Sequence, residues 1–286
     1  MEPRSVRRVG VIGCGLMGSG IAEVVARAGI DVSVLEPTQE LLEAGRGRIE
    51  ASTGRAVDRG KLSEADRDAI VGRIAGVTDV QRLGDVDLVI EAATEDVTGK
   101  VAIFRELDES TRPEVVLATN TSSIPIATLA AATGRPDRVV GMHFFNPPPV
   151  MELLEITPSL STSDETLTFA RGVGERLGKT VVVAPDQAGF IVNRLLIPYL
   201  CAAIRLVDEG GATREDVDTA MTLGMRHPMG PLRLADFIGL DTVLLTAEVL
   251  HEEFRDPRYA PPPRLRRMVA AGMLGRKSGR GFYEYA

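Results

Sequence analysis

Short apolar runs alternate with helical patterns along the first part of the chain. Residues 9–12 form an apolar run that stops at glycines, and residues 16–28 carry apolar side chains at helical spacing. Five further short runs have the pattern of strands: 31–35, 87–90, 115–118, 138–142 and 180–183. Strands that alternate with helices predict a doubly wound, mostly parallel sheet with right-handed crossovers. We therefore expect an α/β domain over residues 1–185.

The strand pattern stops near residue 185, and helical patterns follow. Residues 190–208 are apolar over a surface too wide for a single helix that faces solvent. Thr213 with Asp216 gives a helix-start signal, and residues 240–254 and 264–271 are further helical stretches. The pattern predicts an all-α domain over residues 186–286, in which the wide apolar helix is a candidate contact with a second subunit.

The composition is that of an ordinary soluble protein of 286 residues, of which 44% are hydrophobic and 26% charged. The formal net charge of −7 argues against general affinity for nucleic acid or for anionic membranes. The longest apolar run, residues 195–204, is well short of the roughly 18 residues that indicate a membrane-spanning helix. Cys14 and Cys201 form no CxxC pair, so neither a disulfide framework nor a thiolate metal site is expected.

Arginines near the N-terminus precede a short apolar stretch that ends at Cys14, a pattern that resembles a lipoprotein signal peptide. Only residues 9–13 would form its apolar region, which is shorter than the roughly 7–15 residues required. The glycines of this stretch fit a nucleotide-binding turn better. We expect a cytoplasmic protein in a reducing compartment rather than a secreted one.

The first predicted strand leads into a glycine-rich turn. Gly13, Gly15 and Gly18 fit the pattern G-x-G-x-x-G, and Leu16 and Met17 lie between the last two glycines. The first glycine permits a tight turn, the second lets a pyrophosphate approach the backbone, and the third allows close packing of the next helix. The N-terminus of that helix offers N–H groups and a positive dipole end to the phosphates. The turn predicts a dinucleotide site, and the alternative is a glycine turn without a ligand.

An acidic residue, Glu36, closes the second predicted strand 18 positions after Gly18, near the roughly 20 expected of dinucleotide-binding folds. Its carboxylate would accept hydrogen bonds from the adenosine ribose hydroxyls and would repel a 2′-phosphate. We therefore expect NAD rather than NADP as the cofactor.

His143 directly follows the strand predicted at 138–142. Ligands of doubly wound sheets bind at the carboxyl ends of strands, so an imidazole there could reach a substrate beside a nicotinamide. From position alone, a catalytic base and a packed histidine are equally good interpretations. Taken alone, Glu155 is typical of a surface charge at a strand end, and Ser122 and Asn193 are typical of turn or capping residues.

Longer motifs decide between these interpretations. The run H-F-F-N-P that begins at His143, with V-M-E-L-L-E at 150–155, strongly resembles the 3-hydroxyacyl-CoA dehydrogenase family. Further matches in the family's order extend over nearly the whole chain: residues 13–18, 91–95, 120–123, 189–194, 227–231, 239–242 and 275–283. The likeness is strongest to short, stand-alone bacterial members that act on 3-hydroxybutyryl-CoA. It implies a Rossmann-type NAD-binding domain followed by an all-α domain for substrate binding and dimerisation.

The resemblance implies reversible, NAD-dependent oxidation of an (S)-3-hydroxyacyl-CoA to a 3-oxoacyl-CoA by a homodimer. It makes His143 the general base and Glu155 its partner carboxylate, while Ser122 and Asn193 position the substrate oxygens. Beyond the glycine turn and Glu36, the positions that match cofactor contacts are Glu95, Lys100, Asn120, Ser122, Asn146 and Lys277. Taken alone, a lysine or glutamate is usually solvated.

A basic stripe follows Glu36 on the helix predicted at about 38–58. Its members, at spacings of 4, 3 and 4, are Arg48, Ser52, Arg55 and Arg59, and Lys61 extends it. A solvated helix face explains this pattern at least as well as a phosphate site does. The resemblance adds that Ser52 and Arg59 match CoA-contacting positions. We therefore predict a CoA site at Ser52, Arg55, Arg59 and Lys61, with Ser122 also in contact with the substrate.

Thr53 and Gly54 replace larger residues that are usual at this helix in relatives. This departure leaves open the same chemistry on a hydroxyacyl unit tethered to an acyl carrier protein. A β-hydroxyacid dehydrogenase is less favoured, because it would use a catalytic lysine in the helical domain and give His143 no role. A non-catalytic binding or structural protein is the remaining alternative, and it would be expected to lose His143 or Glu155.

Overall fold

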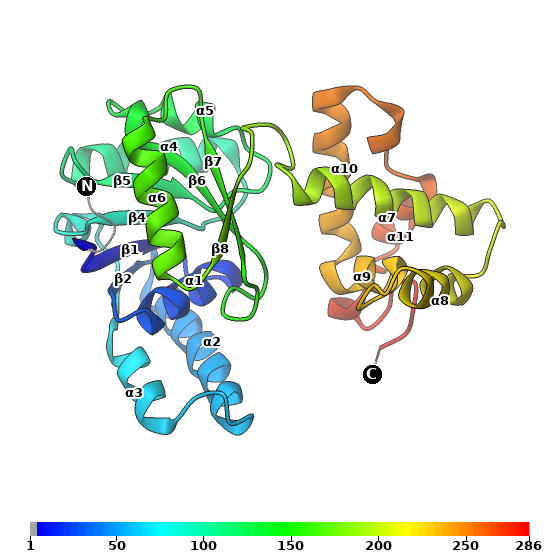
Figure 1. Ribbon diagram of the computed structural model, residues 1–286, viewed down its shortest axis with the longest axis horizontal. Coiled ribbons are helices and arrows are strands. Elements are labelled where there is room, and N and C mark those ends of the chain that lie inside the picture. The colour runs from blue at the N-terminus through cyan, green and yellow to red at the C-terminus, as the bar shows by residue number, and fades with distance from the viewer. Residues whose placement is uncertain (1–4, 286) are drawn as a thin grey trace. The chain divides into compact units, whose positions relative to one another are not determined.

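The computed structural model describes residues 5–285, and in this part of the chain eight strands form one sheet. Their bounds are Arg8–Ile12 (β1), Asp31–Leu35 (β2), Ile74–Val77 (β3), Leu88–Glu91 (β4), Val116–Thr119 (β5), Val139–Phe144 (β6), Leu153–Pro158 (β7) and Thr180–Val183 (β8). The strand order is β3-β2-β1-β4-β5-β6-β7-β8, and neighbours are parallel except for the antiparallel pair β6 and β7. The expected Rossmann-type, mostly parallel sheet is confirmed (Figure 1).

Helices cover both faces of this sheet. Their bounds are Leu16–Arg27 (α1), Gln39–Asp58 (α2), Glu64–Gly72 (α3), Val97–Ser110 (α4), Ile126–Ala130 (α5) and Asp164–Arg176 (α6). Figure 1 shows α1 and α6 on one face, and one core cluster joins them to alternate strand residues such as Ile90 and Met142. The alternation turns Glu91, Thr119 and His143 to the opposite face, which α4 and α5 cover.

Two strands were not expected from the sequence. The edge strand β3 reads I-A-G-V and is half-exposed, so it lacks both a long apolar run and a clean alternation. The strand β7 reads L-L-E-I-T-P, and its polar residues are buried together with its apolar ones. Because β7 returns antiparallel to β6, it places Glu155 directly opposite His143.

The chain from Gln187 onward forms a second compact unit, and the first unit ends at Asp186. The helices of the second unit are Val192–Asp208 (α7), Arg214–Gly224 (α8), Pro231–Ile238 (α9), Leu240–Phe254 (α10) and Pro263–Ala270 (α11). The expected helical C-terminal domain is confirmed, and α9 is an addition to it. Buried Asp236 accepts hydrogen bonds from the N–H groups of Phe282 and Tyr283, both at 2.9 Å, which ties the C-terminal segment to the core. Within residues 5–285, none of the helices is long and apolar enough to cross a membrane.

Gly54 lies inside α2, where an added Cβ would meet nothing within 4 Å. Glycine in a helix interior costs roughly 0.5–1 kcal/mol relative to alanine. We expect Gly54→Ala to raise the free energy of unfolding by about that amount in urea denaturation. The contrasting variant is Gly45→Ala in the same helix, whose Cβ would lie 2.3 Å from the Cys14 sulfur and should lower the free energy of unfolding. A loss of stability in Gly54→Ala would contradict the expectation.

Candidate active site

The carboxyl ends of β1, β4, β5 and β6 meet at one edge of the sheet. The strand registers pair Ile12 with Glu91, Glu91 with Thr119, and Thr119 with Gly141. His143 lies two residues beyond Gly141 and is still part of β6, rather than just after the strand as expected. The loops that follow these strands therefore converge, at the edge where doubly wound sheets bind ligands.

The glycine-rich turn has the geometry that a dinucleotide requires. Gly13 has a φ of +88°, which favours glycine. A Cβ on Gly18 would lie 1.9 Å from the Gly13 carbonyl oxygen, whereas a Cβ on Gly15 would meet nothing within 4 Å. The turn is thus tightly packed at Gly18 and open at Gly15. Helix α1 begins at Leu16 without a side-chain cap from Gly15, so its first N–H groups fit a pyrophosphate on the open side.

Glu36 follows β2 and turns back to the same loop. Its Oε1 accepts a hydrogen bond from the Cys14 N–H, which holds the carboxylate where ribose hydroxyls are predicted. The Arg48 guanidinium donates to the Cys14 carbonyl oxygen at 3.3 Å. Arg48, which the spacing grouped with the CoA stripe, therefore reaches the cofactor loop instead. Burial raises the pKa of the Cys14 thiol to about 11, so Cys14 is a neutral filler of the turn at pH 7.

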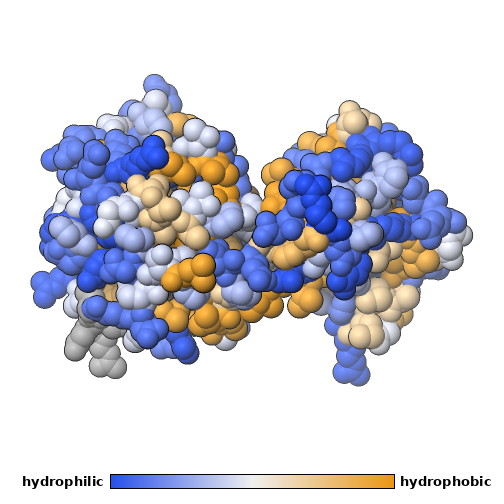
Figure 2. Space-filling view, turned by 90° about the horizontal axis from the view of Figure 1, so that it is seen from above, coloured by the Kyte–Doolittle hydropathy of each residue, from blue (hydrophilic) through white to orange (hydrophobic). Residues whose placement is uncertain are grey.

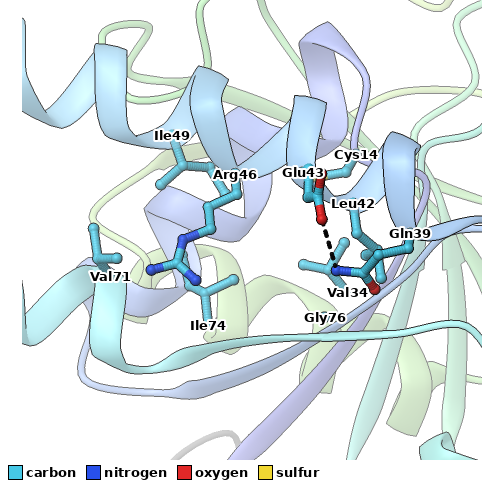
Figure 3. Close-up of a pocket in the computed structure, with 10 residues that line it drawn as sticks. All are labelled: Cys14, Val34, Gln39, Leu42, Glu43, Arg46, Ile49, Val71, Ile74 and Gly76. Atoms are coloured by element: carbon cyan, nitrogen blue, oxygen red, sulfur yellow. Dashed lines mark hydrogen bonds between the residues drawn. The ribbon is translucent and has the colours of Figure 1, made fainter.

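A cavity of about 360 Å³ lies behind this loop, between α2 and the β2–β3 edge (Figure 3). Its floor is apolar, and Arg46 points into it while Gln39 donates a hydrogen bond to Glu43 at 3.4 Å. Cys14 is one of the residues that line this cavity. Among the described residues that line this cavity, none belongs to the predicted cofactor, catalytic or CoA contacts. The predicted chemistry therefore lies at the strand edge and not in this cavity.

His143 and Glu155 form a buried pair across the antiparallel strands. Nδ1 of His143 lies 2.7 Å from Oε2 of Glu155, and Glu155 is 0% exposed. Because a carboxylate only accepts, Nδ1 carries the proton of this bond, and Nε2 is the nitrogen that can exchange one. The Phe145 ring packs 4.6 Å from the imidazole, centroid to centroid. The interpretation of Glu155 as a surface charge is wrong, since the return of the chain through β7 buries it.

The loops after β4 and β5 bring three more predicted residues together. The Asn120 side-chain oxygen accepts a hydrogen bond from the Phe144 N–H at 2.8 Å, which links the end of β5 to the strand of His143. Ser122 donates its N–H to Glu95 Oε1 at 3.0 Å. Asn120, Ser122 and Glu95 thus lie at the same strand edge as the histidine.

Lys100 lies in the first turn of α4 and is only 1% exposed. Its Nζ is 2.6 Å from Oε1 of Glu91 and 3.4 Å from Oε2 of Glu95, so the ordinary expectation of a solvated lysine is wrong. Glu91 is itself 0% exposed and was not among the predicted site residues. A glutamate that closes the otherwise apolar strand L-V-I-E was the signal in the sequence, because such a buried carboxylate requires a partner.

The remaining predicted residues lie elsewhere in the fold. Asn146 is exposed, three residues after His143. Asn193 is half-buried in the first turn of α7, and Lys277 pairs with Asp241 at 2.6 Å, both within the helical unit.

The predicted CoA stripe runs along α2 and past its end. Ser52 is half-buried, and Arg55 and Arg59 are exposed. Lys61 is exposed just beyond the helix. Thr53 turns inward and donates its hydroxyl to the Ile49 carbonyl oxygen at 2.9 Å. The basic side chains therefore form an accessible surface that can contact phosphates.

Two family models match consecutive parts of the chain. Residues 8–187 match the 3-hydroxyacyl-CoA dehydrogenase NAD binding domain, and residues 189–285 match the 3-hydroxyacyl-CoA dehydrogenase C-terminal domain. Together they extend over nearly all of the chain.

Individual relatives agree with these models. The chain is 55% identical to a 3-hydroxybutyryl-CoA dehydrogenase of Mycobacterium tuberculosis over 286 residues, 98% of this chain and 99% of the relative. It is similar to the crystal structure of M. tuberculosis FadB2, with a TM-score of 0.97, 54% identity and coverage of 98% and 99%. The (S)-3-hydroxybutyryl-CoA dehydrogenase of Ralstonia eutropha has a TM-score of 0.94, 45% identity and coverage of 99% and 100%. The chain therefore belongs to the 3-hydroxyacyl-CoA dehydrogenase family and is an NAD-dependent dehydrogenase.

Proposed function

We propose that this enzyme oxidises a short (S)-3-hydroxyacyl-CoA, such as 3-hydroxybutyryl-CoA, to the 3-oxoacyl-CoA, and that the reaction is reversible. The observation that carries the proposal is the buried His143–Glu155 pair, 2.7 Å apart at the carboxyl edge of an NAD-binding sheet. The names of the M. tuberculosis and R. eutropha relatives support a short acyl-CoA substrate. They favour a CoA ester over a carrier-protein tether.

The oxidation removes a proton from the substrate hydroxyl and a hydride from the carbon that bears it. Bound NAD supplies the hydride acceptor. Nε2 of His143 takes the hydroxyl proton as general base and returns it in the reverse reaction. Glu155 fixes the tautomer with the proton on Nδ1 and stabilises the imidazolium that forms, as a buried carboxylate does for the histidine of hydrolase triads. Its burial strengthens this effect, because little water screens the charges.

In the proposed reaction Ser122 and Asn193 position the substrate oxygens. Ser122 follows β5 at the strand edge, where its backbone is fixed by Glu95. Asn193 enters through its matched position at the start of α7. Hydrogen bonds from these two residues to the reacting oxygen or the thioester oxygen would orient the substrate for proton transfer.

The proposed cofactor contacts within the first unit follow the same edge of the sheet. We assign the pyrophosphate to the backbone from Gly13 to Gly18, including Leu16 and Met17, and the adenosine ribose to Glu36. The residues that we assign to the nicotinamide half are Glu95, Asn120, Ser122, Asn146 and Lys277, with Lys100 beside them. We assign the CoA phosphates to Ser52, Arg55, Arg59 and Lys61 on and after α2, because guanidinium and ammonium groups pair well with phosphate.

We further propose a cytoplasmic homodimer that associates through the helical unit. Hydrophobic side chains, orange in Figure 2, reach the surface among hydrophilic ones. In the helical unit the large exposed apolar residues are Ile191, Leu195, Leu206, Leu223, Met225, Phe237 and Leu245. Burial of some of these side chains against a second copy would remove apolar area from water, which favours association.

The test of the proposed function is NADH formation from (S)-3-hydroxybutyryl-CoA, measured by absorbance with NAD and, in parallel, with NADP. We expect turnover with NAD and a kcat/KM with NADP that is lower by about tenfold or more, because the Glu36 carboxylate repels a 2′-phosphate. A longer acyl-CoA and a hydroxybutyryl unit on acyl carrier protein serve as comparison substrates. Turnover of only the carrier-bound unit would overturn the CoA assignment while leaving the chemistry intact.

A further inference from the structure

A single buried carboxylate joins the loops that follow β4 and β5. Glu91 accepts hydrogen bonds from three sides: the Ala93 N–H at 2.7 Å, the Thr119 hydroxyl at 2.7 Å, and the Lys100 ammonium at 2.6 and 2.8 Å. Glu91 as a whole is 0% exposed. A carboxylate without water requires such donors, so its position is set by all three neighbours.

The ammonium of Lys100 is equally constrained. Besides both oxygens of Glu91, it lies 3.4 Å from the Ala93 carbonyl oxygen and 3.4 Å from Glu95 Oε2. An ammonium has three N–H donors, and these contacts direct all of them toward the two glutamates and the loop between them. Lys100 therefore bridges the buried Glu91 to Glu95, whose side chain is partly exposed.

Glu95 in turn organises the turn that carries Ser122. Its other oxygen, Oε1, accepts hydrogen bonds from the Thr121 hydroxyl at 2.5 Å, the Ser122 N–H at 3.0 Å and the Ser123 hydroxyl at 3.1 Å. One carboxylate thus holds three consecutive residues after β5. The chain of contacts runs from Glu91 through Lys100 and Glu95 to Ser122.

The same network borders the dinucleotide loop. A Cβ on Gly13 would lie 3.0 Å from the Ala92 carbonyl oxygen and 3.1 Å from the Ala93 Cα, so the loop after β4 packs directly against the glycine turn. A shift of the β4 loop would therefore move the groups next to the bound cofactor. Misplacement by about 1 Å can cost about a hundredfold in rate, which is why such loops need fixed supports.

We propose that Glu91 and Lys100 are positioning residues, a buried ion pair that holds Glu95 and the Ser122 turn in place for the nicotinamide half of NAD and for the substrate. The inference rests on the proposed function, because that function assigns Glu95 and Ser122 to the cofactor and the substrate. It adds a residue, Glu91, that touches neither. It also gives Lys100 a role that acts through Glu95.

The test compares two ligands that share the adenosine half. NAD and ADP both offer an adenosine and a pyrophosphate to Glu36 and the glycine turn, whereas only NAD carries the second ribose and the nicotinamide. In Glu91→Gln and in Lys100→Met we expect the Kd of NAD, measured by calorimetry, to rise by about tenfold or more. A misplaced Glu95 would weaken a hydrogen bond between its carboxylate and NAD, and loss of a hydrogen bond to a charged group has an effect of this size. We expect the Kd of ADP to stay within about twofold of the wild-type value, because ADP lacks the ribose and the nicotinamide that we assign to Glu95 and Ser122.

Removing one member of the pair leaves the other charge buried, so either single variant can fail to fold. The double variant Glu91→Gln/Lys100→Met removes both charges together and should recover much of the thermal stability. It should still bind NAD about tenfold more weakly relative to ADP, because Glu95 has lost its support. Retention of the wild-type ratio of the two dissociation constants in the double variant would overturn the proposal.

Asp108→Asn is the matched control. Asp108 forms a partly buried ion pair with Arg135, 2.7 Å between Oδ1 and Nε, near the C-terminal end of α4 and thus away from the carboxyl edge of the sheet. It should lower stability without changing the ratio of NAD to ADP affinity. If the Asp108→Asn ratio changes as much as that of Glu91→Gln, the pair has only a structural role. The test measures binding and not turnover. A wild-type enzyme that binds NAD but does not oxidise 3-hydroxybutyryl-CoA would therefore contradict the proposed substrate, and it would leave the proposed role of Glu91 and Lys100 standing.

Discussion

Replacement of His143 by glutamine is expected to lower kcat for oxidation of (S)-3-hydroxybutyryl-CoA by about 10²–10⁴-fold, the range typical of general acid–base catalysis. Glutamine offers a polar side chain of similar reach but cannot take up a proton near neutral pH. The buried Glu155 would also lose the donor that lies 2.7 Å away. The affinity for NAD should change little, because the proposed contacts of its adenosine half are the glycine turn and Glu36. Steady-state kinetics with a calorimetric Kd for NAD separate the two effects.

His251→Gln is the control for this variant. It makes the same chemical change in α10 of the helical unit, at a histidine that the proposed reaction does not use. We expect it to keep kcat within about twofold of wild type. A His143→Gln enzyme with near-normal kcat would remove this residue from the role of general base, whatever the wild-type activity.

The strands that the sequence predicts correctly are those with a strong local pattern. The strands at 31–35 and 180–183 coincide with β2 and β8, because each is a short, β-branched run between turn residues. The strand β7 was missed because a glutamate interrupts its apolar residues, and only the neighbouring β6 explains how that glutamate can be buried. A pattern within one segment does not contain the partner that compensates a buried charge.

The same limit explains the site. The glycine turn could be read from the sequence because all of its requirements lie within a few consecutive residues. The burial of Lys100 could not, because its partner Glu91 ends a different element and the contact depends on where the loop after β4 places the start of α4. The contact of Arg48 is hidden for a related reason: helical spacing groups it with Arg55, and only the fold shows that its long side chain reaches the Cys14 carbonyl oxygen.

Replacement of Glu155 by glutamine is expected to lower kcat by about 10²-fold or more while the protein still folds. Glutamine keeps the size of the side chain, so the β6–β7 pairing and the buried packing of β7 can persist. The charge that stabilises the imidazolium is lost, and the amide can present its N–H₂ group to Nδ1, which places the imidazole proton on Nε2. That tautomer cannot accept the substrate proton, and the corresponding change in a hydrolase triad costs about 10⁴-fold.

Two measurements distinguish this effect from a general loss of structure. The thermal unfolding of Glu155→Gln should be compared with that of Asp108→Asn, which also converts a carboxylate of an ion pair to an amide but at the opposite edge of the sheet. Both variants can lose stability, yet only Glu155→Gln should lose turnover at a temperature where both are folded. Equal kcat values for the two variants would mean that the Glu155 carboxylate only supports the fold. A deficit confined to Glu155→Gln would mean that its charge acts on His143 during proton transfer, since the two carboxylates differ in the base that they contact.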